Sequence, residues 1–156
     1  MTNAIFLVDE IDDINKIKNI VSQKQPTVFS LNYVTHINLE KYNISHKIGE
    51  LYLSDEDYKN IDDLVINTTL NWYKNDLLEK AVIFDKINLA VSLEMEFIQY
   101  FTKIYLTILT MTKIIETEKP NHVFCITYLN DFIKRYCEMK KIQVTEIEKN
   151  TIIVLM

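Results

Sequence analysis

Polar side chains that could bind a ligand follow the strands that the sequence predicts. Carboxyl ends of parallel strands meet at one edge of a sheet, and ligands of open α/β sheets bind in the crevice beyond that edge. Carboxylate, amide and hydroxyl groups suit a hydroxyl-rich ligand there, and a helix N-terminus attracts anionic groups. The predicted ligand-binding residues are Asp9, Glu10, Tyr128, Asn130 and Asp131, with Asn32, Tyr33 and Thr127 as further candidates. The competing interpretation of Asn130 and Asp131 is ordinary capping of the next helix.

The glycine content excludes several catalytic and nucleotide-binding motifs. The chain has one glycine, Gly49, where average usage predicts about eleven. The motifs GxGxxG, GxxxxGK[ST] and GxSxG each need at least two glycines, which excludes a dinucleotide fingerprint, a phosphate-binding loop and a nucleophile elbow. No catalytic residue and no cofactor is therefore predicted.

Two acidic patterns invite comparison with nucleotide-dependent and phospho-acceptor proteins. The run IFLVDE, residues 5–10, matches a Walker B strand, but the required phosphate-binding loop has no room in the four residues before it. Receiver domains gather acids at strand ends, as Asp9, Glu10 and Asp55 would, yet their lysine follows a strand whereas Lys119 follows a predicted helix. The simpler interpretation of IFLVDE is a strand ending in acids that cap the next helix.

The histidines and cysteines show no metal-binding spacing. His36, His46 and His122 fall in three segments without an HxxxH or HxxE pattern, so each is interpreted as a surface or loop residue and no metal is predicted. Cys125 and Cys137 form no CxxC motif. Both are predicted to be small buried hydrophobic residues in a reducing compartment.

Length and charge narrow the class of protein. With 156 residues, 48% of them hydrophobic, the chain suits a single domain, 1–156, with a sizeable core. The net charge of −5, without a basic cluster, argues against nucleic acid as a partner. The N-terminus lacks the basic segment of a signal peptide, and four charged residues interrupt the apolar stretch 93–115. We expect a cytoplasmic protein without a transmembrane segment.

The first third of the chain alternates predicted strands and helices. The continuous apolar run Ala4–Val8 predicts a central parallel strand, and the acids after it predict a helix that ends near Gln25. A second strand is predicted at 27–34, a loop with a short helix at 36–43, and a weaker strand at 48–53.

Two helices with an apolar face follow. Ser54 and Asp57 form a capping-box pattern for a helix that runs to about Lys74. The next segment is either a short strand or an irregular lead into a long helix, with Asp85 as N-cap and an end before Pro120. The apolar face of this long helix consists of Phe97, Phe101, Ile104, Ile108, Met111 and Ile115, at spacings of four and three.

The C-terminal part returns to the alternation. A buried strand is predicted at 122–128 and a helix at 130–140, followed by strands at 143–147 and 151–155 that either pair as a hairpin or extend the sheet separately. The predicted inward residues of the helix are Phe132, Ile133, Tyr136 and Met139. Strands that alternate with helices predict a three-layer α/β sandwich with a mainly parallel sheet and one long amphipathic helix.

Four segments between Asp57 and Val144 have the layout of a known family. They are the Trp72-Tyr73 helix, INLAVSLEMEFIQYFTKIYLTILTMTKIIE, the turn EKPNHVF, and the helix NDFIKRYCEMKKIQV. Together they resemble the N-terminal half of GT-B-type glycosyltransferases and related surface-polysaccharide biosynthesis enzymes. In that family two Rossmann-like halves face each other across a cleft. The C-terminal half holds most of the nucleotide-sugar site, and the N-terminal half mainly binds the acceptor.

The resemblance implies a Rossmann-like, acceptor-side domain that takes a glycan or a lipid-linked acceptor. Since the chain has the length of one half, it implies the N-terminal half of a larger protein, inactive in sugar transfer alone. The scarcity of glycine departs from the family, whose strand-to-helix loops often use it, so no catalytic residue is carried over.

The alternative is a non-catalytic α/β interaction module that pairs through an apolar helix or an edge strand, with a second domain or another copy of the chain as partner. The apolar end TIIVLM suits either a following domain or a strand that a partner completes.

Overall fold

The structure, a computed structural model, describes residues 3–11, 13–75 and 77–147. The predicted strand at 151–155 lies outside these residues. Contacts divide the chain into two compact units. Unit 1 comprises Met1–Tyr52 and Thr110–Met156, and unit 2 comprises Leu53–Leu109.

Unit 1 is built on a five-stranded parallel sheet in the order β3-β2-β1-β6-β7. This order confirms the predicted parallel sheet, with the first strand and the strand after Pro120 in its interior. β1 pairs with β2 on one side and with β6 on the other. The strands are β1 (Ala4–Val8), β2 (Thr27–Ser30), β3 (Lys47–Ile48), β6 (His122–Ile126) and β7 (Gln143–Glu146).

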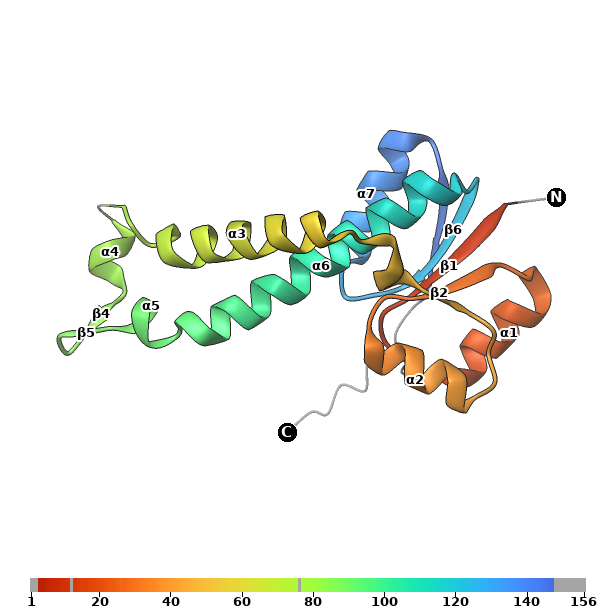
Figure 1. The fold of residues 1–156 in the computed structure, drawn as a ribbon, viewed down its shortest axis with the longest axis horizontal. Helices are drawn as coiled ribbons and strands as arrows, with labels where there is room; N and C mark the ends of the chain where they lie inside the picture. The colour runs from red at the N-terminus through yellow and green to blue at the C-terminus, as the bar shows by residue number, and fades with distance from the viewer. Residues whose placement is uncertain (1–2, 12, 76, 148–156) are drawn as a thin grey trace. The chain divides into compact units, whose positions relative to one another are not determined.

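Helices cover both faces of this sheet, which confirms the three-layer, Rossmann-like α/β sandwich (Figure 1). One face carries α1 (Ile14–Lys24) and α2 (Tyr33–Lys41), and the other carries α7 (Asn130–Lys140) and the end of α6 (Glu94–Glu118).

Side chains of β1 point alternately to the two faces of the sheet and so contribute to both hydrophobic cores. Phe6 and Val8 pack in the α1–α2 layer, whereas Ile5 and Leu7 pack in the α6–α7 layer. All four side chains are fully buried. A central parallel strand is covered on both faces, and this explains the uninterrupted apolar run in the sequence.

The helices α1 and α2 begin at side-chain caps. Asp13 accepts a hydrogen bond from the backbone N–H of Asn15, and Asn32 accepts one from the N–H of Thr35. The predicted strand 27–34 is therefore too long. β2 ends at Ser30 because Asn32 caps α2, and the chain is helical from Tyr33.

The predicted strand 48–53 is also wrong in extent. β3 has two residues, and Gly49–Tyr52 forms the 3₁₀ helix η1. A Cβ atom on Gly49 would lie 2.7 Å from the carbonyl oxygen of Ser30 and 2.9 Å from Thr110 Cγ2. The φ of Gly49 is not positive. The one glycine of the chain thus meets a need for space and not for a left-handed backbone.

Left-handed helix ends fall on residues other than glycine. Gln25, with φ 48°, follows α1, and Lys141, with φ 58°, follows α7. Glycine is the usual residue at this position because a Cβ atom disfavours the conformation. Unit 1 therefore contains backbone strain that its packing offsets.

Unit 2 is mainly helical. It contains α3 (Asp55–Asn71), α4 (Leu78–Ala81), β4 (Ile83–Phe84), β5 (Ile87–Asn88), α5 (Leu89–Ser92) and the first part of α6. The predicted capping box is confirmed, since Asp57 N–H donates to Ser54 Oγ and Ser54 N–H donates to Asp57 Oδ2.

The predicted N-cap of the long helix is wrong. Asp85 and Lys86, with φ 47° and 67°, form the two-residue turn between β4 and β5. Such a hairpin turn needs positive φ at both positions. α6 begins nine residues later, at Glu94, and ends at Glu118, before Pro120 as predicted.

The apolar face of α6 is confirmed in part. Met111 and Ile115 are buried in unit 1, together with Ile114. The remaining members of the predicted face, which belong to unit 2, are half-buried: Phe97, Phe101, Ile104 and Ile108.

In α7 the predicted inward residues are confirmed except one. Ile133 is fully buried, but Met139 is 82% exposed. Six residues of helix rotate Met139 about 240° from Ile133, onto the outer face. Cys137, four residues after Ile133, occupies the inner face instead. Cys125 and Cys137 are free and buried, as predicted.

Candidate functional site

Asp9 marks the carboxyl end of the central strand. The β1–β6 register pairs Val8 with Ile126, so the residues that follow, Asp9 and Thr127, are neighbours. The strand order reverses here, because β1 leads to β2 on one side while β6 and β7 lie on the other. This is the switch point at which open α/β sheets bind ligands. The candidate site lies at this edge of unit 1.

Asp9 is 3% exposed and its carboxylate is hydrogen-bonded on both sides. Its Oδ1 accepts from Asn32 Nδ2 at 2.7 Å, and its Oδ2 accepts from Thr127 Oγ1 at 3.2 Å. The Asp9 N–H donates to the carbonyl of Ile126 at 2.9 Å. A buried carboxylate needs such partners because desolvation of an unpaired charge is costly.

The backbone of Asp9 also ties the second strand to the first. Its carbonyl accepts from Asn32 Nδ2 at 2.8 Å and from Thr35 Oγ1 at 2.6 Å. Leu31 N–H donates to the carbonyl of Val8. Asp9 therefore holds the carboxyl ends of β1, β2 and β6 together. These hydrogen bonds fix the backbone at the candidate site.

The other predicted ligand-binding residues follow Asp9 or Thr127 in the chain and differ in exposure. Glu10 and Tyr128, next after Asp9 and Thr127, are half-buried, as is Asn130, whereas Asp131 is exposed. Their role as ligand-binding residues stays a prediction. Tyr33 is 67% exposed, and its ring lies 6.2 Å from that of His36.

Capping of α7 differs from the sequence prediction. The cap position is Leu129, which makes no side-chain cap, so neither Asn130 nor Asp131 caps the helix. Thr127 Oγ1 accepts from the Leu129 N–H at 3.1 Å, and Asn130 Oδ1 accepts from Cys125 Sγ at 3.7 Å. The carboxylate of Asp131 lies in the first turn, where the helix dipole favours it.

The thiols are unsuited to nucleophilic chemistry. Burial raises the pKa of Cys125 to about 12, with Glu146 and Cys137 adding to the shift. Burial alone raises the pKa of Cys137 to about 11. Because the thiolate is the reactive form, both cysteines are inert structural residues at neutral pH.

A histidine pair that the sequence did not predict joins His36 of α2 to His46, the residue before β3. His46 Nδ1 is 2.8 Å from the carbonyl of Ile44 and must donate to it, so Nε2 of neutral His46 accepts from His36 Nδ1 at 2.8 Å. Glu40 Oε1 lies 3.7 Å from His36 Nε2. Among the described residues, no group of three or more His, Cys, Asp or Glu side chains could hold a metal ion.

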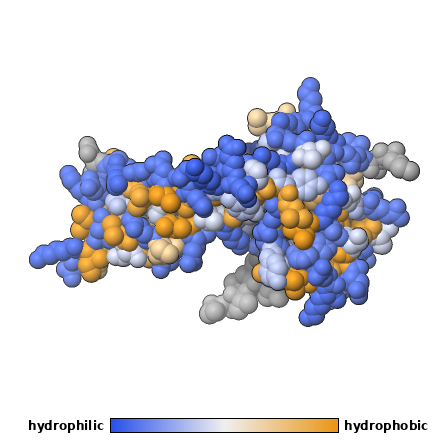
Figure 2. Space-filling view, viewed as in Figure 1, coloured by the Kyte–Doolittle hydropathy of each residue, from blue (hydrophilic) through white to orange (hydrophobic). Residues whose placement is uncertain are grey.

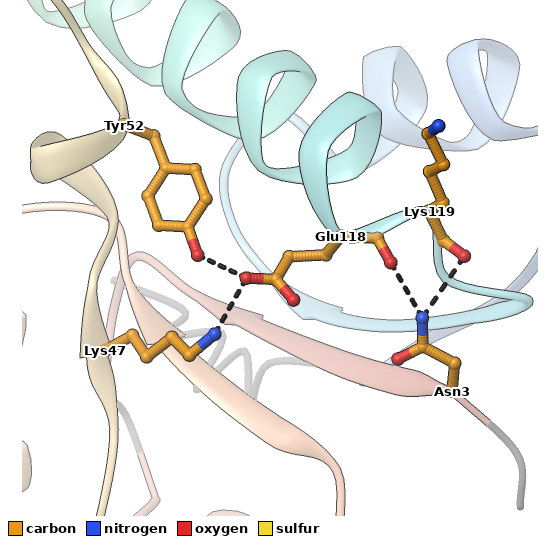
Figure 3. A network of polar contacts seen from close by, with 5 residues as sticks. All are labelled: Asn3, Lys47, Tyr52, Glu118 and Lys119. Atoms are coloured by element: carbon orange, nitrogen blue, oxygen red, sulfur yellow. Dashed lines mark hydrogen bonds and ion pairs between the residues drawn. The ribbon is translucent and has the colours of Figure 1, made fainter.

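The opposite edge of the sheet holds a second polar network (Figure 3). Lys47 Nζ lies 2.7 Å from Glu118 Oε1, which also accepts from the Tyr52 hydroxyl. Asn3 Nδ2 donates to the carbonyls of Glu118 and Lys119 at 2.7 and 3.2 Å. This network joins the end of α6 to β3 and to the residue before β1.

The pKa values of this network follow from its contacts. Hydrogen bonds from Lys47 and Tyr52 lower the pKa of Glu118. The hydrogen bond to Glu118 raises the pKa of Lys47, and burial, followed by the hydrogen bond to Glu118, raises the pKa of Tyr52. All three pKa shifts favour a charged Lys47–Glu118 pair and a neutral Tyr52 at neutral pH. The network therefore stabilises the fold of unit 1.

Surface cavities of about 380, 410 and 430 Å³ also lie near the amino ends of the strands. The first is lined by Lys24, His122 and Phe124, among others. Burial, and secondarily the charge of Lys24, lowers the pKa of His122, whose Nε2 contacts Thr145 Oγ1 at 2.9 Å. A neutral imidazole bonded to a hydroxyl suits packing more than anion binding.

Compared with protein-family models, with curated proteins and with solved structures, this chain matches none of them. In the part of the chain that the structure describes, no helix is long and apolar enough to cross a membrane. Function must therefore be inferred from the geometry of unit 1 and unit 2 themselves.

Proposed function

We propose that this chain is the acceptor-side domain of a GT-B-like glycosyltransferase of surface-glycan biosynthesis. The acceptor, a glycan or a lipid-linked sugar, binds beyond the carboxyl ends of β1 and β6. The observation that carries the proposal is the switch point between these strands, where the Asp9 network holds three strand ends in place.

The side chains at this edge suit a sugar. Carboxylates and amides accept and donate hydrogen bonds to vicinal hydroxyls, and an aromatic ring can pack on the apolar face of a pyranose. Glu10, Tyr128, Asn130 and Asp131 offer these groups, and none of the four is fully buried. Asp9 itself acts as a positioning residue.

The glycine content supports the acceptor side over the donor side. The only glycine, Gly49, fills a packing position beside Ser30. Nucleotide phosphates are usually held by glycine-rich turns at a helix N-terminus, and the chain has no such turn. The nucleotide sugar would then bind to a second Rossmann-like domain, and the enzyme would work in the cytoplasm.

Titration of the full chain by NMR, with a panel of nucleotide sugars and glycan fragments, tests this function. We expect glycan-induced shifts at residues 9–10 and 127–131 and weak or no nucleotide-sugar binding. Tight nucleotide-sugar binding would contradict the acceptor-side role. Glycan shifts confined to residues far from those strand ends would remove the proposed site.

A matched pair of variants on α7 sharpens the test. Asp131→Asn should weaken glycan binding about tenfold, because a hydrogen bond to a charged group contributes roughly 1.5–3 kcal/mol. Glu138→Gln removes a similar exposed charge toward the other end of the same helix and should leave affinity unchanged. Equal affinities in the two variants would exclude Asp131 from the site.

A further inference from the structure

The interior of unit 2 contains few apolar side chains. Among residues 53–75 and 77–109, the buried hydrophobic residues are Ile61, Val65, Tyr73 and Ala90. Six others between α4 and the first turn of α6 are more than half exposed: Leu77, Ile83, Phe84, Ile87, Val91 and Met95. We call these six residues the hairpin patch. Figure 2 shows apolar surface gathered over the end of unit 2 that carries α4, β4, β5 and α5.

The hairpin at the centre of this patch is short and leaves apolar side chains exposed. β4 and β5 have two residues each, and a lone two-stranded hairpin is at best marginally stable in water. Ile83, Phe84 and Ile87 are 51%, 71% and 55% exposed. Burial of these three side chains against a partner would therefore add to the stability of the hairpin.

The exposed area has the size of a dimer interface. Five of the six residues are aliphatic, so each is assigned the lower end, roughly 150 Å², of the area of a large side chain, and their exposed fractions then amount to about 600 Å² per chain. Two such patches in contact would bury about 1,200 Å², which is the lower end for specific interfaces. The largest apolar patch of a typical monomeric protein is roughly 300–600 Å², so the hairpin patch is at the upper end of that range.

Charge around the patch favours a protein partner of mixed charge. Residues 74–96 contain three lysines and five acidic residues. This acidic excess opposes binding to an anionic lipid surface, which attracts basic segments. In a two-fold contact the same surface faces itself, so the lysines of one chain meet a surface of the other chain on which acids outnumber lysines.

We propose that the hairpin patch is the contact surface between two copies of this chain. Phe84 is the anchor of the contact, because an exposed aromatic side chain at the tip of a hairpin can enter the apolar surface of the other copy. The contact lies in unit 2 and uses none of the residues proposed to bind a glycan, so it does not depend on that function.

Sedimentation velocity of the full chain over a range of concentrations tests the dimer. We expect a concentration-dependent dimer, and Phe84→Glu should weaken association at least tenfold, the effect of losing an interface anchor. Met139→Glu is the matched control, since Met139 is 82% exposed on α7 of unit 1, and it should dimerise like the original chain. A monomer at all concentrations, or equal loss of dimer in both variants, would overturn the proposal.

Two further measurements keep the proposal testable if Phe84→Glu fails to fold. In the original chain, hydrogen exchange at residues 83–88 should slow as concentration rises, whereas exchange that is independent of concentration would contradict a contact there. Flotation with vesicles of phosphatidylcholine and phosphatidylglycerol covers the lipid alternative. Binding of monomers to these vesicles, with no dimer in solution, would identify a membrane as the occupant of the patch.

Discussion

Unit 1 and unit 2 differ in how completely they bury large apolar side chains. In unit 1 a sheet with helices on both faces buries Phe6, Ile17 and Phe29 completely. In unit 2, Phe84 and Leu77 are 71% and 84% exposed. A sheet offers two extended faces that helices can cover, whereas short elements such as β4 and α5 cover little of one another. Apolar composition therefore stabilises the fold in unit 1 and offers a contact surface in unit 2.

Buried polar groups differ in the same way. In unit 1, Asp9, Thr35 and Thr127 are buried and hydrogen-bonded. In unit 2, the buried atoms Thr69 Oγ1 and Trp72 Nε1 have no hydrogen-bond partner among the described residues. An unsatisfied buried donor costs about 1–3 kcal/mol. These two atoms of unit 2 therefore lack the stabilisation that the buried polar groups around Asp9 have in unit 1, although Thr107 of unit 2 donates to the carbonyl of Lys103.

The largest expected effect comes from truncating one phenylalanine in each unit. Phe6→Ala should lower the free energy of unfolding by about 3–5 kcal/mol, because Phe6 is fully buried between β1 and the α1–α2 layer. Phe84→Ala, at a concentration where the chain is monomeric, should change it by less than about 0.5 kcal/mol. Urea denaturation followed by circular dichroism measures both changes. Similar losses of unfolding free energy in the two variants would contradict the proposed difference between the units.

Adding one methyl group tests how tightly unit 1 is packed. Gly49→Ala should destabilise by about 1–3 kcal/mol, since the new Cβ would lie 2.7 Å from a backbone oxygen of Ser30. Gln25→Gly removes a Cβ atom from a residue with left-handed backbone at the end of α1. This substitution should stabilise the protein by up to about 1 kcal/mol. Thermal melts compare the two variants. A harmless Gly49→Ala would mean that this part of unit 1 is loosely packed.

Thr→Val substitutions in the two units should affect the free energy of unfolding differently. Thr127→Val removes the hydroxyl that donates to Asp9 and accepts from Leu129, and should cost about 1–2 kcal/mol. Thr69→Val removes a buried hydroxyl without a partner and should be neutral or stabilise by up to about 1 kcal/mol. Urea midpoints of the two variants decide this, and a destabilising Thr69→Val would show that its hydroxyl is in fact satisfied.

The smallest effect concerns pH and should be confined to unit 1. The pKa of Glu118 is lowered below its ordinary value of 4.5 by Lys47 and Tyr52, so its stabilisation is present above that value and is lost as pH falls through the lowered pKa. Lys47 and Tyr52 have raised pKa values, so their contribution is present below their ordinary values and is lost as pH rises through the raised ones.

Glu118→Gln should therefore flatten the acid limb of the stability curve, by less than about 1 kcal/mol because Lys47 is half exposed. Urea titrations between pH 3 and 7 measure the slope, with Glu138→Gln on α7 as the control for an exposed acid. An unchanged acid limb in Glu118→Gln would show that the network does not contribute to stability.

Local sequence patterns determined several elements of both units without reference to tertiary contacts. The apolar run Ala4–Val8 and the break at Pro120 in unit 1, and the capping box at Ser54 in unit 2, each depend on a few adjacent residues, and all three are confirmed. The same patterns failed where two elements compete for one segment. The β-rich residues 31–34 gave way to α2 because Asn32 bonds to Thr35 and to Asp9, a partner 23 residues away.

The candidate site shows the same division. The sequence alone placed Asp9 and Thr127 at strand ends, because strand ends follow from periodicity and the carboxyl edge follows from parallel pairing. Their hydrogen bond joins residues that are 118 positions apart in the sequence. Only the order of the strands in the sheet brings these two residues together. Thr35 was missed as a partner of Asp9 because nothing in its neighbourhood distinguishes it from any other threonine near a helix start.

Burial in unit 2 was decided by tertiary structure alone. Phe97 and Met111 belong to one apolar face of α6 by their spacing, yet Met111 is fully buried and Phe97 is half-buried. Periodicity records which side of a helix is apolar and contains no information on what covers that side. The sheet of unit 1 covers Met111, whereas the residues around Phe97 belong to a unit with few elements to bury them.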